Sequence, residues 1–115
     1  MTVKATREGL IGEKTASGFV IERVVPFVAL PSVNALGKFV RLSANGRTCI
    51  AVVLDVGPWN EHDDAYVFRG ARPLAETGYD TRGRKTNGAG LDLGEKVWAL
   101  LGMTDNGNVD WSFVE

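Results

Sequence analysis

The sequence has only one cysteine, Cys49, and one histidine, His62, among its 115 residues. One thiol cannot form an internal disulfide, so a hydrophobic core must hold the fold together. Zinc sites usually take about four His, Cys or carboxylate ligands, so this shortage argues against a common zinc site. We therefore expect no metal and no cofactor. Cys49 lies within an apolar run, and we interpret it as a small core residue.

Long apolar runs and an excess of one charge are also missing. The longest stretch without a charged residue, 24–37, is interrupted by Pro26, Pro31 and Asn34, whereas a membrane-spanning helix needs about 20 apolar residues. Thirteen basic and 14 acidic residues leave a net charge of −1, and nucleic-acid-binding domains usually carry a clear basic excess. The sequence therefore predicts neither a membrane nor a nucleic acid as partner.

Glycine, by contrast, is abundant. Fourteen glycines lie along the chain without a period, which indicates many tight turns between short strands. Asn45-Gly46 is a strong hairpin signal between a polar–apolar alternation and an apolar, β-branched run, and it predicts a hairpin over 38–55. Further strands are expected at 18–25, 27–30 and 108–114, the last with Trp111 on its inner face.

One segment, 94–101, has helical periodicity. Leu93, Val97, Leu100 and Leu101 share one helix face, Trp98 is assigned to the core, and Gly102 ends the helix. One short helix among several short strands predicts a mainly β fold, because a small sheet protects its edges best by closing into a barrel. We expect a six-stranded barrel that forms a single domain over 1–115.

Residues 60–90 do not fit this pattern. They are polar and glycine-rich, and we predict a long polar insertion with a short strand or sheet edge at 66–68. Loops longer than about 12–15 residues are usually functional or disordered. The insertion contains five basic residues, Arg69, Arg72, Arg82, Arg84 and Lys85.

Two acidic residues stand out because each lies between apolar residues at a predicted strand end or helix start. Asp55 ends an apolar strand and precedes Gly57-Pro58-Trp59, while Asp92 lies just before the helix. Asp55 could simply form a turn, and Asp92 could cap the helix. His62 is either a solvated loop residue or a proton-transfer group. Trp59 either packs in the core or exposes a flat face.

Several sequence blocks occur in a characteristic order. They are Gly-Glu-Lys-Thr-Ala-Ser-Gly at 12–18, Ala-Leu-Pro-Ser at 29–32, Leu-Gly-Lys-Phe-Val at 36–40, Asn-Gly-Arg at 45–47, Val-Leu-Asp-Val-Gly-Pro-Trp at 53–59 and Leu-Asp-Leu-Gly at 91–94. Together they resemble the double-psi β-barrel domain of the rare lipoprotein A group, which is related more distantly to expansins and barwin. The resemblance covers 9–114.

This resemblance implies a double-psi β-barrel that recognises peptidoglycan or another polysaccharide. Some members of the group are lytic transglycosylases. The resemblance places Asp92 and Asp55 in one groove, with Asp92 as acid and base, Asp55 in support, and His62 as a further catalytic candidate. Breaking a glycosidic bond needs a proton on the leaving oxygen, and a carboxyl whose pKa is raised by burial can supply it. Candidate substrate-binding residues are Trp59, Asn60, Tyr66 and Arg84.

Three departures from the group's pattern keep alternatives open. Val56 replaces an arginine, Gly94 replaces a serine, and the 60–90 insertion is longer than the corresponding connection. The insertion could form a groove wall that contacts anionic groups, or it could cover the groove. The chain could therefore be a non-catalytic, expansin-like polysaccharide-binding module. It could also be a structural or assembly protein, for example in a phage particle, that kept only the barrel.

The N-terminal residues lack the apolar segment of a secretory signal. We therefore expect synthesis in the cytoplasm, with any delivery to the cell wall independent of such a signal.

Overall fold

The computed structural model describes residues 1–22 and 24–114, which form six strands and four short helical segments. In chain order these are β1 (Thr2–Arg7), β2 (Phe27–Leu30), the 3-10 helix η1 (Val33–Ala35), β3 (Phe39–Ala44), β4 (Arg47–Val56), α1 (Asp64–Arg69), the 3-10 helix η2 (Leu74–Thr77), β5 (Leu91–Leu93), α2 (Glu95–Leu100) and β6 (Gly107–Phe113). None of the described helices is long and apolar enough to cross a membrane.

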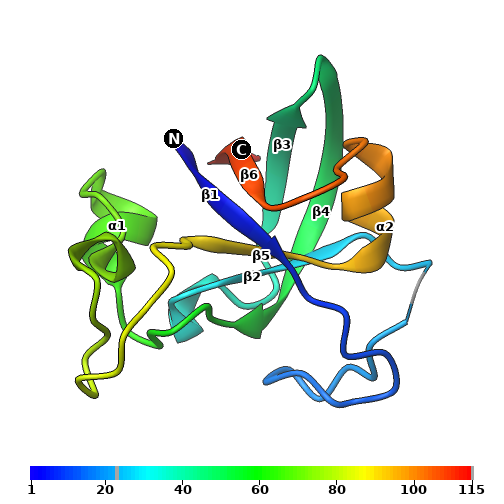
Figure 1. The fold of residues 1–115 in the computed structure, drawn as a ribbon. Coiled ribbons are helices and arrows are strands. Elements are labelled where there is room, and N and C mark those ends of the chain that lie inside the picture. The colour runs from blue at the N-terminus through cyan, green and yellow to red at the C-terminus, as the bar shows by residue number, and fades with distance from the viewer. Residues whose placement is uncertain (23, 115) are drawn as a thin grey trace.

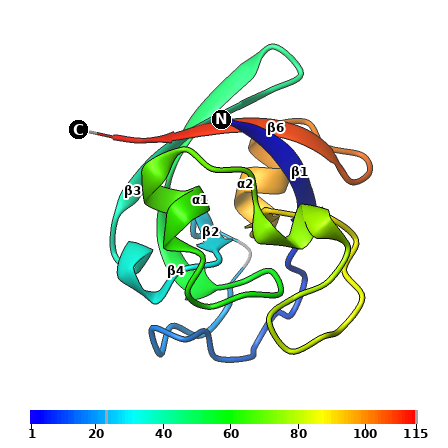
Figure 2. The same ribbon diagram turned by 90° about the vertical axis from the view of Figure 1, so that its left-hand side faces the viewer.

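The six strands close into a barrel in the order β1-β5-β2-β4-β3-β6 (Figures 1 and 2). The β1–β5 and β2–β4 pairs are parallel, and the other four pairs are antiparallel. Parallel neighbours cannot be joined by a tight turn, so long connections must cross over the barrel. The predicted closed six-stranded barrel is confirmed.

The β3–β4 hairpin follows from its two turn residues. Asn45 and Gly46 have φ angles of 54° and 72°, and a two-residue turn with positive φ at both positions matches the twist of the flanking strands. The Asn45 side chain also donates a hydrogen bond of 2.9 Å to the Leu101 carbonyl, which ties the turn to the end of α2. The predicted hairpin over 38–55 is confirmed.

Alternate side chains of the strands point into the barrel and form its core. Buried members include Val3, Val28, Leu30, Val40, Leu42, Val53, Leu91, Leu93, Val109 and Trp111. Helix α2 adds Val97 and Trp98 to this cluster and packs against β4. Trp98 and Trp111 are therefore core residues, as predicted, whereas Leu100 is exposed.

Part of the predicted insertion plugs one end of the barrel. Residues 66–68, expected as a strand, belong to α1, which lies across the open ring of strands in Figure 2. Trp111 Nε1 donates a hydrogen bond of 2.8 Å to the Tyr66 hydroxyl, which donates one of 2.9 Å to the Gly90 carbonyl. The prediction of a polar loop over 60–90 is therefore incomplete, because α1 and η2 lie within this range.

The N-terminal third also differs from the prediction. Thr2–Arg7 forms the unpredicted strand β1 between β5 and β6. The strand expected at 18–25 does not form in the described part of that range, which lies in the connection from β1 to β2. There, Val20 makes only an isolated bridge with Lys14.

We predict that Gly94→Ala destabilises the fold by about 1–3 kcal/mol, because overpacking a filled site costs that much. A Cβ at Gly94 would lie 2.5 Å from Cε1 of the buried Phe27 ring, although the φ of −64° suits any residue. The control is Gly107→Ala, whose Cβ would meet nothing closer than 3.9 Å. Urea unfolding should separate the two variants, and equal stabilities would contradict the packing argument.

Candidate functional site

A row of aligned residues crosses four neighbouring strands of the barrel. Thr6 of β1 pairs with Asp92 of β5, Asp92 pairs with Ala29 of β2, and Ala29 pairs with Asp55 of β4. Partners in register point to the same face of a sheet, and Leu91 and Leu93 on either side of Asp92 face the core. The row therefore lies on the outer face, with the two aspartates two strand spacings apart, about 10 Å between backbones.

Asp55 reaches this face because the alternation of inward and outward side chains along β4 shifts by one residue. Val53 pairs with Val28 inside the barrel, but the next β2 residue, Ala29, pairs with Asp55 rather than Leu54. Such a register shift is the signature of a β-bulge, in which one extra residue turns the following side chain to the opposite face. Without this shift, Asp55 would point into the core.

The carboxyl of Asp92 is set up to exchange a proton near neutral pH. The side chain is half-buried, and the Thr6 hydroxyl donates a short hydrogen bond to Asp92 Oδ1. Burial raises the pKa of Asp92 to about 6; the Thr6 hydrogen bond opposes this shift, and the charge of Asp55 adds to it. Asp92 therefore meets the pKa requirement of a general acid and base.

The carboxylate of Asp55 is fixed by backbone amides. Asp55 Oδ1 accepts hydrogen bonds of 2.9 Å from the amides of Ala16 and Val56. Ala16 belongs to the 12–18 sequence block, and Ser17 N also donates to the Leu54 carbonyl at 3.3 Å. The block thus docks on the end of β4 and orients Asp55.

A third carboxyl, Glu8, lies beside the two aspartates and was not predicted. It follows β1, is only 8% exposed, and its backbone amide donates a hydrogen bond of 2.8 Å to the Leu93 carbonyl. Burial raises the pKa of Glu8 to about 9, and the neighbouring carboxyls of Asp55 and Asp92 add to this shift. No sequence signal marks Glu8, because its place depends on the path of the chain after β1.

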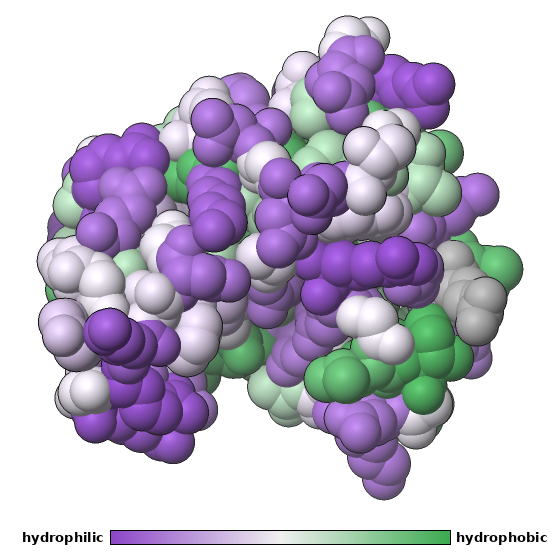
Figure 3. All heavy atoms as spheres, in the orientation of Figure 1, coloured by the Kyte–Doolittle hydropathy of each residue, from purple (hydrophilic) through white to green (hydrophobic). Residues whose placement is uncertain are grey.

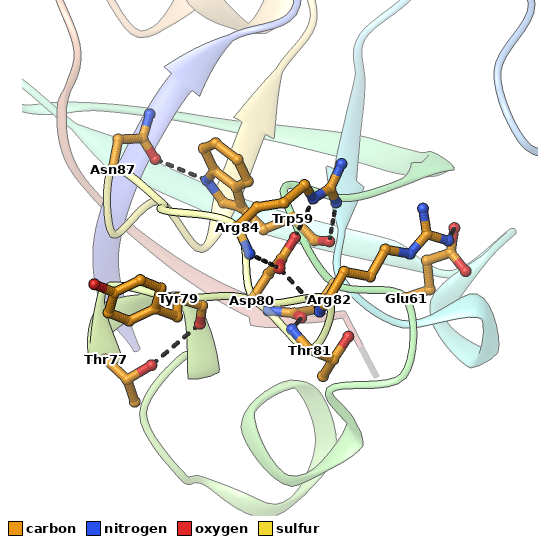
Figure 4. Close-up of polar contacts among 10 residues, drawn as sticks. Trp59, Glu61, Thr77, Tyr79, Asp80, Thr81, Arg82, Arg84 and Asn87 are labelled. Atoms are coloured by element: carbon orange, nitrogen blue, oxygen red, sulfur yellow. Dashed lines mark hydrogen bonds and ion pairs between the residues drawn. The ribbon is translucent and has the colours of Figure 1, made fainter.

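Trp59, four residues after Asp55, is held by polar contacts to the second half of the insertion (Figure 4). Trp59 Nε1 donates a hydrogen bond of 2.9 Å to Asn87 Oδ1, and the Arg84 guanidinium lies 6.0 Å from the centroid of the indole ring. Arg84 is in turn held by an ion pair of 2.6 Å with Asp80, whose carboxylate also accepts from the Arg82 amide. Trp59 is half-buried, so part of its ring is accessible.

The surface is hollowed between two parts of the chain. The 60–90 insertion lies on one side and the connection from β1 to β2 on the other, with β2 and β5 between them (Figure 1). Figure 3 shows the hollow on this face. Asp55 and Asp92 are both partly exposed, so the insertion stands beside them and does not seal them.

Three of the predicted site residues, Tyr66, Asn60 and His62, are not part of the Asp55–Asp92 row. Tyr66 is 1% exposed and its hydroxyl donates to the Gly90 carbonyl inside the core, so the structure contradicts its prediction as a substrate-binding residue. Asn60 is 2% exposed and accepts a hydrogen bond of 3.0 Å from the Thr81 amide, so it supports the insertion rather than offering a surface. His62 is exposed but pairs with Ser32, beyond the end of β2.

A separate cavity of about 430 Å³ lies on another part of the surface. It is lined by Lys38, Phe39, Phe68, Phe113 and Val114. None of these lining residues has a carboxyl group, so this cavity is distinct from the Asp55–Asp92 row. Among the residues that the structure describes, no group of three or more His, Cys, Asp or Glu side chains is arranged to hold a metal ion.

The fold is similar to several solved structures. Streptomyces papain inhibitor aligns with a TM-score of 0.59 and 21% identity, over all of this chain and 94% of that one. Apo Clavibacter michiganensis expansin aligns with a TM-score of 0.58 and 18% identity over all of this chain and 51% of its own, so this chain spans about half its length. Cerato-platanin 3 from M. perniciosa gives 0.57 and 11%, over all of this chain and 95% of that one.

At these identities the likeness shows the fold, a double-psi β-barrel. A mutant of the Clavibacter expansin in complex with cellohexaose also aligns, with a TM-score of 0.55 and 17% identity over 51% of that chain and all of this one. No curated protein sequence matches the chain. A family model described as "Domain of unknown function (DUF8814)" matches residues 1–76.

We predict that Asp92→Asn becomes more stable relative to the wild type as pH rises from about 4 to about 6. The folded pKa of Asp92, about 6, lies above its ordinary value of 3.8. The wild type therefore loses stability over that window, by about 3 kcal/mol at 1.36 kcal/mol per pKa unit. Urea unfolding at several pH values measures the difference. The exposed Asp105→Asn should show no such slope, and a slope equal to that of Asp92→Asn would refute the assignment.

Proposed function

The chain belongs to the DUF8814 family, and we propose that it is a peptidoglycan-directed, glycan-cleaving protein of the lytic transglycosylase type. The observation that carries the proposal is the pairing of two unlike carboxyls on one outer face. Asp92 is buried enough to hold a proton near neutral pH, and Asp55 is fixed as a hydrogen-bond acceptor two strands away. Carboxyl groups with separated proton affinities are the usual means of glycosidic cleavage.

The reaction needs one carboxyl to act twice. Protonated Asp92 donates its proton to the glycosidic oxygen, and the bond from that oxygen to the anomeric carbon breaks as positive charge develops on the sugar ring. The C6 hydroxyl of the same sugar then attacks the anomeric carbon, and its proton passes to the Asp92 carboxylate. This closes a 1,6-anhydro ring, restores Asp92 and consumes no water.

Asp55 supports this cycle through its charge. A carboxylate held in a fixed orientation stabilises the positive character of the sugar without having to reorganise during the reaction. The amides of Ala16 and Val56 supply that orientation. Thr6 orients Asp92 in the same way, because its hydroxyl donates a hydrogen bond to Oδ1. The other oxygen, Oδ2, lies next to Gly57, at 3.8 Å from the position that a Cβ on this glycine would occupy.

We expect Asp92→Asn to reduce the rate at which anhydro-muropeptides are released from purified sacculi by about 100-fold or more, because an amide cannot donate and recover the proton. The thermal unfolding midpoint at about pH 4, where the folded wild type carries a neutral Asp92, should stay close to that of the wild type. Asp105→Asn, on an exposed turn, is the matched control and should keep full activity. Wild-type protein that releases no sugar fragments would reject the enzymatic proposal.

A second function, polysaccharide binding without cleavage, is favoured by the way Trp59 is held. Its indole is fixed by Asn87 and flanked by Arg84, and a rigid aromatic face binds a sugar ring with little loss of conformational entropy. The cationic side chain beside it would suit a glycan that carries carboxylates. In this case Asp55 and Asp92 would bind sugar hydroxyls instead of transferring a proton.

We expect Trp59→Ala to weaken sedimentation with insoluble peptidoglycan by about tenfold, which corresponds to about 1.4 kcal/mol. Tyr79→Ala removes another aromatic of the same insertion, 53% exposed, and should bind like the wild type. A parallel assay with cellulose tests whether the site prefers one of the two glycans. Equal binding by both alanine variants and the wild type would exclude Trp59 from the site.

A further inference from the structure

Glu8 is a buried charged residue to which the proposed reaction assigns no task. Its side chain is 8% exposed, and Oε2 is fully buried without a hydrogen-bond partner in the described part of the chain. Its backbone is fixed on β5, the strand that carries Asp92, through the bond from Glu8 N to the Leu93 carbonyl. The barrel itself therefore holds the backbone of Glu8 against the strand that carries Asp92, and its buried side chain is close enough to Asp55 and Asp92 to feel their charges.

The charges around Glu8 are mostly negative. Burial alone disfavours its ionised form, and the Asp55 and Asp92 carboxylates oppose a third negative charge. The neighbouring cation Arg7 is bound to Glu95 of α2 through two hydrogen bonds of 2.7 Å. Among the residues that the structure describes, the charged groups next to Glu8 are Arg7 on β1, Asp55 on β4 and Asp92 on β5, and Glu95 of α2 lies beside the following residue, Gly9.

We propose that Glu8 is a positioning residue whose protonated carboxyl donates a hydrogen bond to Asp55 and holds that carboxylate in the site. Two neighbouring carboxyl groups of which one is buried share one proton, because both cannot ionise at low cost. The proton resides on Glu8, since Asp55 is the partner that accepts two backbone hydrogen bonds. Asp55 thereby has donors from three segments of the chain.

This assignment sets an alkaline limit for the site. The folded pKa of Glu8 is about 9, against an ordinary value of 4.5. The proton is therefore kept at neutral pH and lost as pH rises through about 9, when a new negative charge pushes against Asp55. The same shift makes the stability contribution of Glu8 largest below pH 4.5 and progressively smaller up to about pH 9. The catalytic consequence rests on the proposed function, whereas the protonation and positioning of Asp55 do not.

Two variants separate the hydrogen bond from the mere filling of space. Glu8→Gln keeps a donor but cannot ionise, and Glu8→Leu fills a similar volume without a donor. The first measurement is the carboxyl-carbon NMR titration of the wild type, in which Glu8 should titrate near pH 9. The Asp55 carboxyl resonance at pH 7 should stay in place in Glu8→Gln and move in Glu8→Leu. The unfolding free energy should favour Glu8→Gln over the wild type increasingly between pH 5 and 9.

The glycan assay adds a functional readout. At pH 7, Glu8→Gln should keep wild-type cleavage or binding within about twofold and should lose the wild-type decline above pH 9. Glu8→Leu should lose about tenfold or more, because a displaced catalytic group reduces the rate by such factors. If the wild type neither cleaves nor binds glycan, the proposed function fails while the NMR and unfolding results still decide on Glu8. A Glu8 that titrates near its ordinary value, or an Asp55 resonance identical in both variants, overturns the inference.

Discussion

The site depends on one irregularity in one strand. The register shift between Val53 and Asp55 places Asp55 on the outer face of β4, and β2 between β4 and β5 sets its spacing from Asp92. A regular β4 would bury the Asp55 carboxylate among the core residues, where it would be destabilising. The barrel closure matters for the same reason, because β1 must lie against β5 for Thr6 to reach Asp92 and for Glu8 to lie beside both aspartates.

The three carboxyls differ because their surroundings differ. Asp55 receives backbone amides, Asp92 is half-buried and receives a hydroxyl, and Glu8 is buried next to both of them. Among the residues that the structure describes, no Lys or Arg side chain is buried with this cluster, so protons take the place of counterions there. One acidic group then remains protonated well above neutral pH, one exchanges its proton near neutrality, and one serves as the acceptor. This division of roles arises from backbone placement, which several distant segments supply together.

The elements predicted correctly are those with a local cause. The β3–β4 hairpin depends on Asn45 and Gly46, and α2 depends on apolar spacing within a few residues, so a short window of sequence contains the necessary information. Strand β1 and helix α1 were missed or misassigned because tertiary pairing decides them. Residues 66–68 have the composition of a strand, but the Tyr66 hydroxyl is held between Trp111 and Gly90 at the barrel end. Likewise, no local pattern reveals that Glu8 lies beside Asp55, which is 47 positions further along.

The two substitutions that depart from the resembled pattern leave the two site aspartates in place. At position 56 the backbone amide, not the side chain, donates to Asp55, so valine keeps that hydrogen bond while it removes a positive charge beside the row. At position 94 the Phe27 ring occupies the space that a Cβ would need, so the serine of the resembled group would clash here. The helix start at Gly94 is held instead by its amide, which donates to the Phe27 carbonyl at 3.0 Å. Without that arginine the row has less positive charge beside it, so the proton that we propose Glu8 to retain contributes more to holding Asp55 here than it would in a chain that carries the arginine.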